Sequence, residues 1–206
     1  MFASSVLFLL AQAVEVKQEI PWMWIAIGIG VVALLIGIAM YNGLVNGRVE
    51  TANAWAQIDV QLKRRHDLIP NLVETVKGYA KHEQGTLEKV IQARNAAVSA
   101  QGIGNQIAAE NQLSGALRQL FALSEAYPDL KANTNFLGLQ EELKSTENRI
   151  GFARQHYNDS VGKYNSALMR FPNNLVAGFT GFTPVGFYEV APEEAAAVNQ
   201  APKVSF

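Results

Sequence analysis

An uncharged, apolar segment lies near the start of the chain and is followed by a region in which apolar and polar positions alternate at helical spacing. The apolar segment predicts a membrane span. No charged side chain occurs from Ile20 to Gly47, and Trp22 to Tyr41 form a twenty-residue apolar core. A helix of that length spans about 30 Å, the thickness of the hydrocarbon core of a bilayer. Aromatic rings prefer the two membrane surfaces, where this core places Trp22, Trp24 and Tyr41. The pattern predicts one transmembrane helix over residues 21–45.

Beyond the membrane segment, apolar positions recur every three or four residues and predict a series of helices. The first continues from the membrane helix and ends near His66, with a bend favoured by Gly43 and Gly47. The second follows Asp67, has Pro70 in its first turn and is stopped by Gly102 and Gly104. A third, shorter helix runs over about 105–126 and ends at Tyr127-Pro128.

The clearest periodicity belongs to a fourth helix, in which apolar residues recur over about ten turns. Its stripe consists of Phe136, Leu139, Leu143, Ile150, Ala153, Tyr157, Val161, Tyr164, Leu168 and Phe171, with Thr146 in the only gap. Amphipathic helices joined by short turns, without strand alternation, indicate helix-on-helix packing of the coiled-coil type. The predicted fold is therefore all-α, with an antiparallel bundle of about four long helices over residues 46–172.

The last part of the chain, residues 173–206, has a different composition. It interleaves aromatic residues with glycines and then ends in an acidic, Ala-rich tail. The aromatic residues are Phe179, Phe182, Phe187 and Tyr188. We expect this part to be irregular and its aromatic side chains to pack across the open end of the bundle. Contact with a membrane surface or a partner protein is the alternative.

Basic residues beside the span predict its orientation, because Lys and Arg are retained on the cytoplasmic side. Lys17 precedes the span, whereas Arg48 and Lys63-Arg64-Arg65 follow it. The N-terminal residues 1–20 are therefore expected outside and the bundle in the cytoplasm. Ala11-Gln12-Ala13 has the form of a signal-peptide cleavage site, although no Lys or Arg precedes it. Cleaved and uncleaved chains have the same orientation.

Small residues share one face of the predicted span, at Ala26, Gly30, Ala33 and Gly37. Their steps of four, three and four leave a groove into which a second membrane helix can pack closely. In lipid, such close approach of two backbones is a main source of helix association. Because Gly and Ala are common in membrane helices generally, ordinary composition remains the alternative explanation.

The sequence contains no recognisable catalytic constellation. A di-metal site in a helical bundle needs Glu-x-x-His pairs, and no Glu is followed three residues later by His. The three histidines lack a Cys neighbour or a second His at helical spacing, and the sequence has no G-x-S-x-G motif and no cysteine. The 17 Lys and Arg are balanced by 18 Asp and Glu, which gives no general field for nucleic acid. We expect no enzyme, no metal or other cofactor, no small-molecule substrate and no nucleic-acid partner.

Two long blocks of sequence resemble the LemA family of bacterial membrane proteins. They are RRHDLIPNLVETVKGYAKHE at 64–83 and YPDLKANTNFLGLQEELKSTENRIGFARQHYNDSVGKYNSALMRFP at 127–172. The resemblance covers about residues 41–206. It implies a bundle of long helices behind one span in the bacterial cytoplasmic (inner) membrane, with a small outer N-terminus. It also implies partners in envelope stress or membrane quality control, including membrane metalloproteases, and no particular biochemical activity.

Polar residues within these blocks are the candidate interaction positions. They are Arg65, Asp67, Pro70, Asn71, Gln140, Glu147, Arg149, Arg154, Asn158 and Asn165. Asn158 and Asn165 each follow a tyrosine of the apolar stripe, so we expect their amides to bridge neighbouring helices and fix register. A polar seam that receives another protein is the alternative. Arg65 and Asp67 are expected to pair and to cap a helix boundary.

Two functions fit these expectations. In the first, the protein is a membrane-anchored, non-enzymatic scaffold or adaptor that presents its cytoplasmic bundle to protein partners. In the second, it is a structural protein that self-assembles into a homo-oligomer and organises or shapes the membrane. The expected partners in both are the lipid bilayer and proteins, including further copies of this chain.

Overall fold

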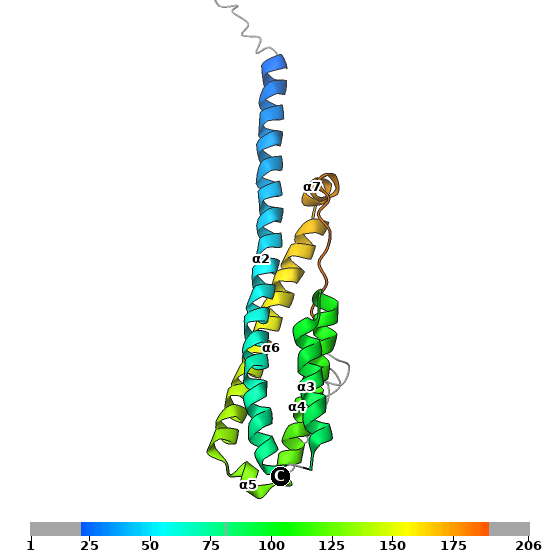
Figure 1. Cartoon of the computed structure of the whole chain (residues 1–206). Coiled ribbons are helices and arrows are strands. Elements are labelled where there is room, and N and C mark those ends of the chain that lie inside the picture. Colours follow the sequence, from blue (N-terminus) through cyan, green and yellow to red (C-terminus); the bar gives the residue numbers. More distant parts are fainter. Residues whose placement is uncertain (1–21, 81, 190–206) are drawn as a thin grey trace, which may run out of the picture. The chain divides into compact units, whose positions relative to one another are not determined.

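The computed structural model describes residues 22–80 and 82–189, and every regular element within them is a helix. The helices are α2 (Trp22–Tyr79), α3 (Gln84–Ser99), α4 (Ile103–Ser124), α5 (Pro128–Lys131), α6 (Thr134–Met169) and α7 (Asn173–Thr180) (Figure 1). The chain divides into two compact units, Met1–Gly43 and Leu44–Phe206. The predicted all-α class is confirmed. The expected outer N-terminus, the A-x-A sequence and the acidic tail lie outside the described residues.

The first unit contains the uncharged beginning of α2. This part of α2 contains an 18-residue window with a mean hydropathy of 2.5, so α2 is long and apolar enough to cross a membrane. None of the residues in that window is buried. Trp22 and Trp24 are 83% and 62% exposed. The small-residue face consists of Ala26, Gly30, Ala33 and Gly37, and a Cβ added at either glycine would meet no atom within 4 Å. These features fit a membrane protein.

The core of the second unit forms where the apolar stripes of α2 and α6 meet. Phe136, near the start of α6, belongs to the same buried cluster as Ile69 and Val76 of α2. Tyr164, near the end of α6, packs instead in a cluster with Leu44. The two long helices are therefore antiparallel, and buried apolar side chains hold them together along the whole contact.

A hairpin of α3 and α4 covers one end of this helix pair. Leu87 of α3 and Leu113 and Leu120 of α4 belong to the same buried cluster as Ile69. The turn between the two helices contains Gly102 with φ of 81°, a conformation that glycine adopts without steric cost. Side chains of α2, α3, α4, α5 and α6 thus build the core at this end, whereas α7 and the residues after it cover α6 at the other end.

The predicted helix boundary at His66-Asp67 is wrong, because α2 continues through Pro70. Proline lacks the N–H that would bond to the carbonyl four residues earlier, which is that of His66. Arg94 of α3 supplies a replacement donor, since its Nε lies 2.9 Å from the His66 carbonyl oxygen. The predicted second helix is divided between the end of α2 and α3, with the break between Tyr79 and Gln84.

Gly47 has a packing role that the sequence did not reveal. Neither Gly43 nor Gly47 interrupts α2. A Cβ at Gly47 would lie only 3.1 Å from Cδ2 of Tyr164, which is closer than side chains normally approach. The glycine therefore makes room for an aromatic ring of α6 against the backbone of α2.

The predicted fourth helix is confirmed as α6. Its buried residues follow the expected stripe from Phe136 to Leu168, including Thr146. Asn133 caps the helix by accepting a hydrogen bond of 3.0 Å from the Phe136 N–H. Two stripe residues differ: Leu139 is half-buried, and Phe171 lies beyond the end of the helix and is 80% exposed.

The chain after α6 is more ordered than expected, because residues 173–180 form α7. Ala177 of α7 packs with Leu168 of α6, and residues after Gly181 then return beside α6 as a coil (Figure 1). Tyr188 is buried as expected for packing on the bundle. Phe179 is 96% exposed, so the expectation is wrong for this residue.

Candidate functional site

A cluster of polar side chains, with buried and half-buried members, lies where α2, α4 and α6 meet. Arg65 and Glu110 expose only 1% and 0% of their surface. Residues this polar are rarely buried unless they are paired. We call the cluster the polar centre; its members are Arg65, His66, Glu110, Ser114 and Glu147.

Each member of the polar centre bonds to another. The Arg65 guanidinium forms an ion pair with Glu110, and its Nη1 donates to Glu147 Oε2 at 2.6 Å and to Ser114 Oγ at 3.1 Å. The other carboxylate oxygen of Glu110 lies 2.7 Å from Nε2 of His66. These contacts join three helices, because Arg65 and His66 belong to α2, Glu110 and Ser114 to α4, and Glu147 to α6.

The two fully buried charges stabilise each other's ionised forms. Burial by itself lowers the pKa of Arg65, but the charges of Glu147 and Glu110 outweigh it and raise the pKa above its ordinary value. Burial likewise raises the pKa of Glu110, but the hydrogen bond with His66 and the charge of Arg65 outweigh it and lower the pKa. Both groups are therefore charged at neutral pH, as in a structural ion pair.

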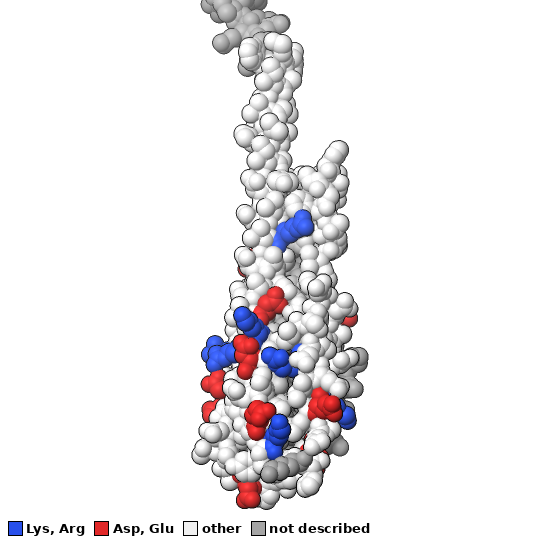
Figure 2. Space-filling model, in the orientation of Figure 1, with Lys and Arg blue, Asp and Glu red and all other residues white. Residues whose placement is uncertain are grey.

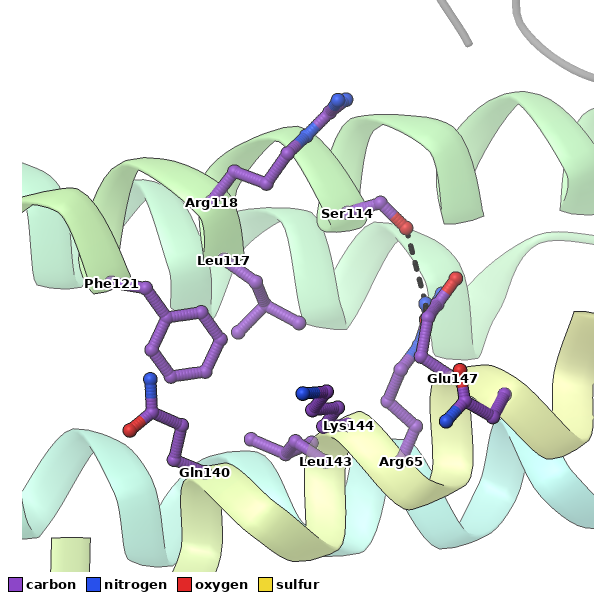
Figure 3. Close-up of a pocket in the computed structure, with 10 residues that line it drawn as sticks. Arg65, Ser114, Leu117, Arg118, Phe121, Gln140, Leu143, Lys144 and Glu147 are labelled. Atoms are coloured by element: carbon purple, nitrogen blue, oxygen red, sulfur yellow. Dashed lines mark hydrogen bonds and ion pairs between the residues drawn. The ribbon is translucent and has the colours of Figure 1, made fainter. Parts of the chain in front are cut away.

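A pocket of about 350 Å³ opens beside the polar centre (Figure 3). Leu117 and Phe121 of α4 and Leu143 of α6 form its apolar walls, and Arg118 extends away from it. The guanidinium of Arg65 at its edge is paired with two carboxylates, and its Nε is buried without a hydrogen-bond partner among the described residues. Among the residues that the structure describes, no group of three or more His, Cys, Asp or Glu could hold a metal ion.

A second polar feature holds the coil that returns beside α6. The Asn165 side chain donates to the Val185 carbonyl at 2.8 Å and accepts from the Val185 N–H at 2.9 Å. Asn158 makes the same pair of bonds with Tyr188, at 3.1 and 2.8 Å. We call Thr183–Tyr188 the returning segment, and the side chains of α6 that bind it the Tyr–Asn groove; these are Tyr157, Asn158, Tyr164 and Asn165.

The tyrosines of the groove also bond to the main chain of the returning segment. The Tyr157 hydroxyl donates to the Gly186 carbonyl at 3.0 Å, and the Tyr164 hydroxyl donates to the Thr183 carbonyl at 3.3 Å. Each Tyr-Asn pair thus binds a unit of three residues. Seven helical residues rise about 10.5 Å, and three extended residues span about 10 Å, so two pairs one heptad apart match two successive units. The segment runs antiparallel to α6.

Tyr188 is the aromatic anchor of the returning segment. It is 3% exposed, with its ring 6.2 Å from that of Trp55 and 4.6 Å from the guanidinium carbon of Arg154. Burial raises the pKa of the Tyr188 hydroxyl. Within the described part of the chain, this hydroxyl and two nitrogens of Arg154, Nε and Nη2, are buried without a hydrogen-bond partner.

The candidate positions from the sequence fall into three groups. Arg65, Gln140 and Glu147 lie together at the pocket, and Arg154, Asn158 and Asn165 lie at the returning segment. The others, Asp67, Pro70, Asn71 and Arg149, are exposed. The expected pairing of Arg65 with Asp67 is wrong, because Arg65 bonds to Glu110 and Glu147 and α2 has no end to cap at this point. Asn158 and Asn165 bind a coil instead of bridging helices.

Glu110, His66 and Ser114 were missed as members of a site. A signal for the first was present, because Glu110 precedes Leu113, Leu117 and Leu120 at steps of three, four and three. Glu110 occupies a position in the apolar repeat of one helix, and Arg65 occupies such a position in another. A carboxylate and a guanidinium at two core positions predict a buried ion pair. The returning segment left no such signal, because the groove contacts its main chain.

Exposed apolar side chains gather on and before α7. Leu175 and Phe179 are one helical turn apart and are 57% and 96% exposed, and Phe171 is 80% exposed. We call these three residues the apolar α7 face. Contiguous exposed apolar patches mark interaction surfaces, and Leu175 and Phe179 have the spacing of neighbours on one side of α7. On the side of the bundle shown in Figure 2, by contrast, acidic and basic residues are intermingled.

A family model and several known proteins match this chain. The model of the LemA family matches residues 54–206. Protein LemA of Metamycoplasma hominis is 30% identical over 143 residues, which cover 66% of this chain and 63% of that protein. Magnetosome protein MamQ 2 of Paramagnetospirillum magneticum is 25% identical over 191 residues, which cover 80% and 70%. MamQ of Magnetospirillum gryphiswaldense is 24% identical over 178 residues, which cover 74% and 65%.

Proposed function

Because the chain belongs to the LemA family, we propose that it is a membrane-anchored, non-enzymatic adaptor whose helical bundle binds other proteins. The apolar α7 face carries the proposal. Phe179 is almost fully exposed on a helix whose opposite side already packs on α6 through Ala177. An exposed apolar surface of this kind is costly in water and is stabilised when a partner covers it. Envelope-stress and quality-control proteins are the proposed partner class.

Affinity purification of the full chain in mild detergent tests the adaptor role. Phe171→Ser with Phe179→Ser should reduce stoichiometric co-purifying proteins by about tenfold or more, since loss of two buried aromatic contacts weakens binding by well over 1.4 kcal/mol. The matched control is Phe152→Ser, because Phe152 is 73% exposed on α6. Equal recovery of partners by both variants, or no partner with the unaltered chain, would contradict the adaptor role.

Self-assembly is the second candidate function, and the small-residue face of the span favours it. A Cβ at Gly30 or Gly37 would meet nothing within 4 Å, so this face is open to another helix. The mass of the detergent complex in the same purification separates the two functions. A large homo-oligomer without other proteins supports assembly, whereas a single copy with partners supports the adaptor.

We also propose that the bundle is cytoplasmic and the N-terminus outside, at the bacterial cytoplasmic membrane. The basic residues after the span support this orientation. In spheroplasts, a membrane-impermeant maleimide should label Gln18→Cys but label Phe152→Cys only after lysis. The chain has no native cysteine to interfere. Labelling of Phe152→Cys in sealed spheroplasts would show that the bundle lies outside and would contradict the proposed orientation.

A further inference from the structure

The Tyr–Asn groove recognises a polypeptide main chain. All six hydrogen bonds between the groove and the returning segment end on backbone carbonyl or N–H groups. The reciprocal bonds made by each asparagine reproduce the pairing between neighbouring strands. This mode of binding supplies affinity through the main chain and specificity through a few side chains. Here Val185 and Tyr188 provide the side-chain contacts.

The returning segment buries fewer of its side chains than the long helices do. Four of its six residues are exposed, and Tyr188 is its one fully buried side chain. Gly181, which has φ of 74°, joins the segment to α7 and provides a position where the chain can change direction. Segments with few buried contacts open at a lower free-energy cost than the core does. The groove can therefore lose its occupant while the bundle stays folded.

We propose that the groove of one copy also binds the returning segment of a second copy. A swapped segment keeps every hydrogen bond and both side-chain anchors, so exchange costs only the opening of the segment and the joining of two molecules. Tethering copies by an apolar helix to one bilayer raises their effective concentration and lowers the second cost. The resulting contact links bundles. It goes beyond the adaptor role and does not depend on it, because a chain without exchange can still bind other proteins.

Cysteine pairs placed in different copies can detect the exchange. A Cβ at Gly162 lies 3.9 Å from Cε1 of Phe187, so Gly162→Cys marks the groove and Phe187→Cys marks the segment. Two copies with different tags, each bearing one of these cysteines, are expressed together and treated in membranes with a short thiol cross-linker. We expect a cross-linked product that carries both tags. Lys89→Cys on α3 replaces Gly162→Cys as the exposed control.

The asparagines should control the yield of this product. Asn158→Ala with Asn165→Ala in the copy that bears Gly162→Cys removes four hydrogen bonds and should lower the mixed-tag yield by about tenfold or more. A single chain with both cysteines reports occupancy within one copy. If this chain cross-links while the mixed copies give no more product than the Lys89→Cys control, exchange between copies is refuted. Failure of both would show that the segment does not occupy the groove at all.

Discussion

Replacing Ile150 by Asp is expected to unfold the helical bundle near room temperature. Ile150 is 0% exposed and packs in one cluster with Ile58 and Leu62 of α2. A carboxylate at this position would be buried without a partner, which costs more than about 4 kcal/mol and approaches the whole stability of a typical domain. Circular dichroism of the full chain in mild detergent should show loss of helix and of the cooperative melting transition.

Residues two turns earlier in α6 supply matched variants. Leu143 is 4% exposed, so Leu143→Asp should behave like Ile150→Asp. Lys144 is exposed one residue further on, so Lys144→Asp should change the melting temperature little. Equal melting of the three variants would show that the buried face of α6 is assigned wrongly.

Replacing Glu110 by Gln should lower the free energy of unfolding by about 3–5 kcal/mol, because it leaves Arg65 buried with part of its charge unbalanced. The exposed pair of Arg64 and Glu142 is the control, since its side chains are 49% and 50% exposed. Glu142→Gln should cost less than about 1 kcal/mol. Urea unfolding of the full chain in detergent, followed by circular dichroism, measures both changes. A cost for Glu110→Gln no larger than that of the control would contradict the role of the polar centre.

The polar centre also predicts a direction for the effect of pH. The lowered pKa of Glu110 means that folding favours its ionised form. The associated stability is therefore fully present above the unfolded-state pKa of about 4.3, and it is lost as the pH falls through the lower folded-state value. Glu110→Gln should remove this part of the acid sensitivity. An unchanged acid unfolding profile would assign that sensitivity to other carboxyl groups.

Long periodic stretches of the fold were predictable from sequence, and interrupted stretches were not. The stripe of α6 extends over more than nine turns, so its period determines both the helix and its buried face. Pro70 predicts the first turn of a new helix, because local sequence cannot show that Arg94 replaces the missing donor. The polar centre shows the same limit, since Glu110 and Arg65 are 45 residues apart and meet only through the packing of α2 against α4.

The asparagines of α6 illustrate which part of a site a sequence pattern can reveal. The spacing of Asn158 and Asn165 beside stripe tyrosines correctly placed their side chains next to the core. It did not identify their partner. A groove that binds main-chain atoms places few demands on the sequence of its occupant, and residues 183–188 therefore contain no pattern that points to it.

The repeat of the Tyr–Asn groove has a consequence for alignment of its occupant. Because each Tyr-Asn pair binds three residues, a slide of the segment by three positions would present the same donors and acceptors again. Only side-chain size distinguishes these positions: Phe182, Val185 and Tyr188, three residues apart, are all at least partly buried. A slide that moved Val185 into the place of Tyr188 would leave a cavity beside Trp55. The hydrogen bonds thus repeat every three residues and allow several registers, and the fit of the Tyr188 side chain selects one of them.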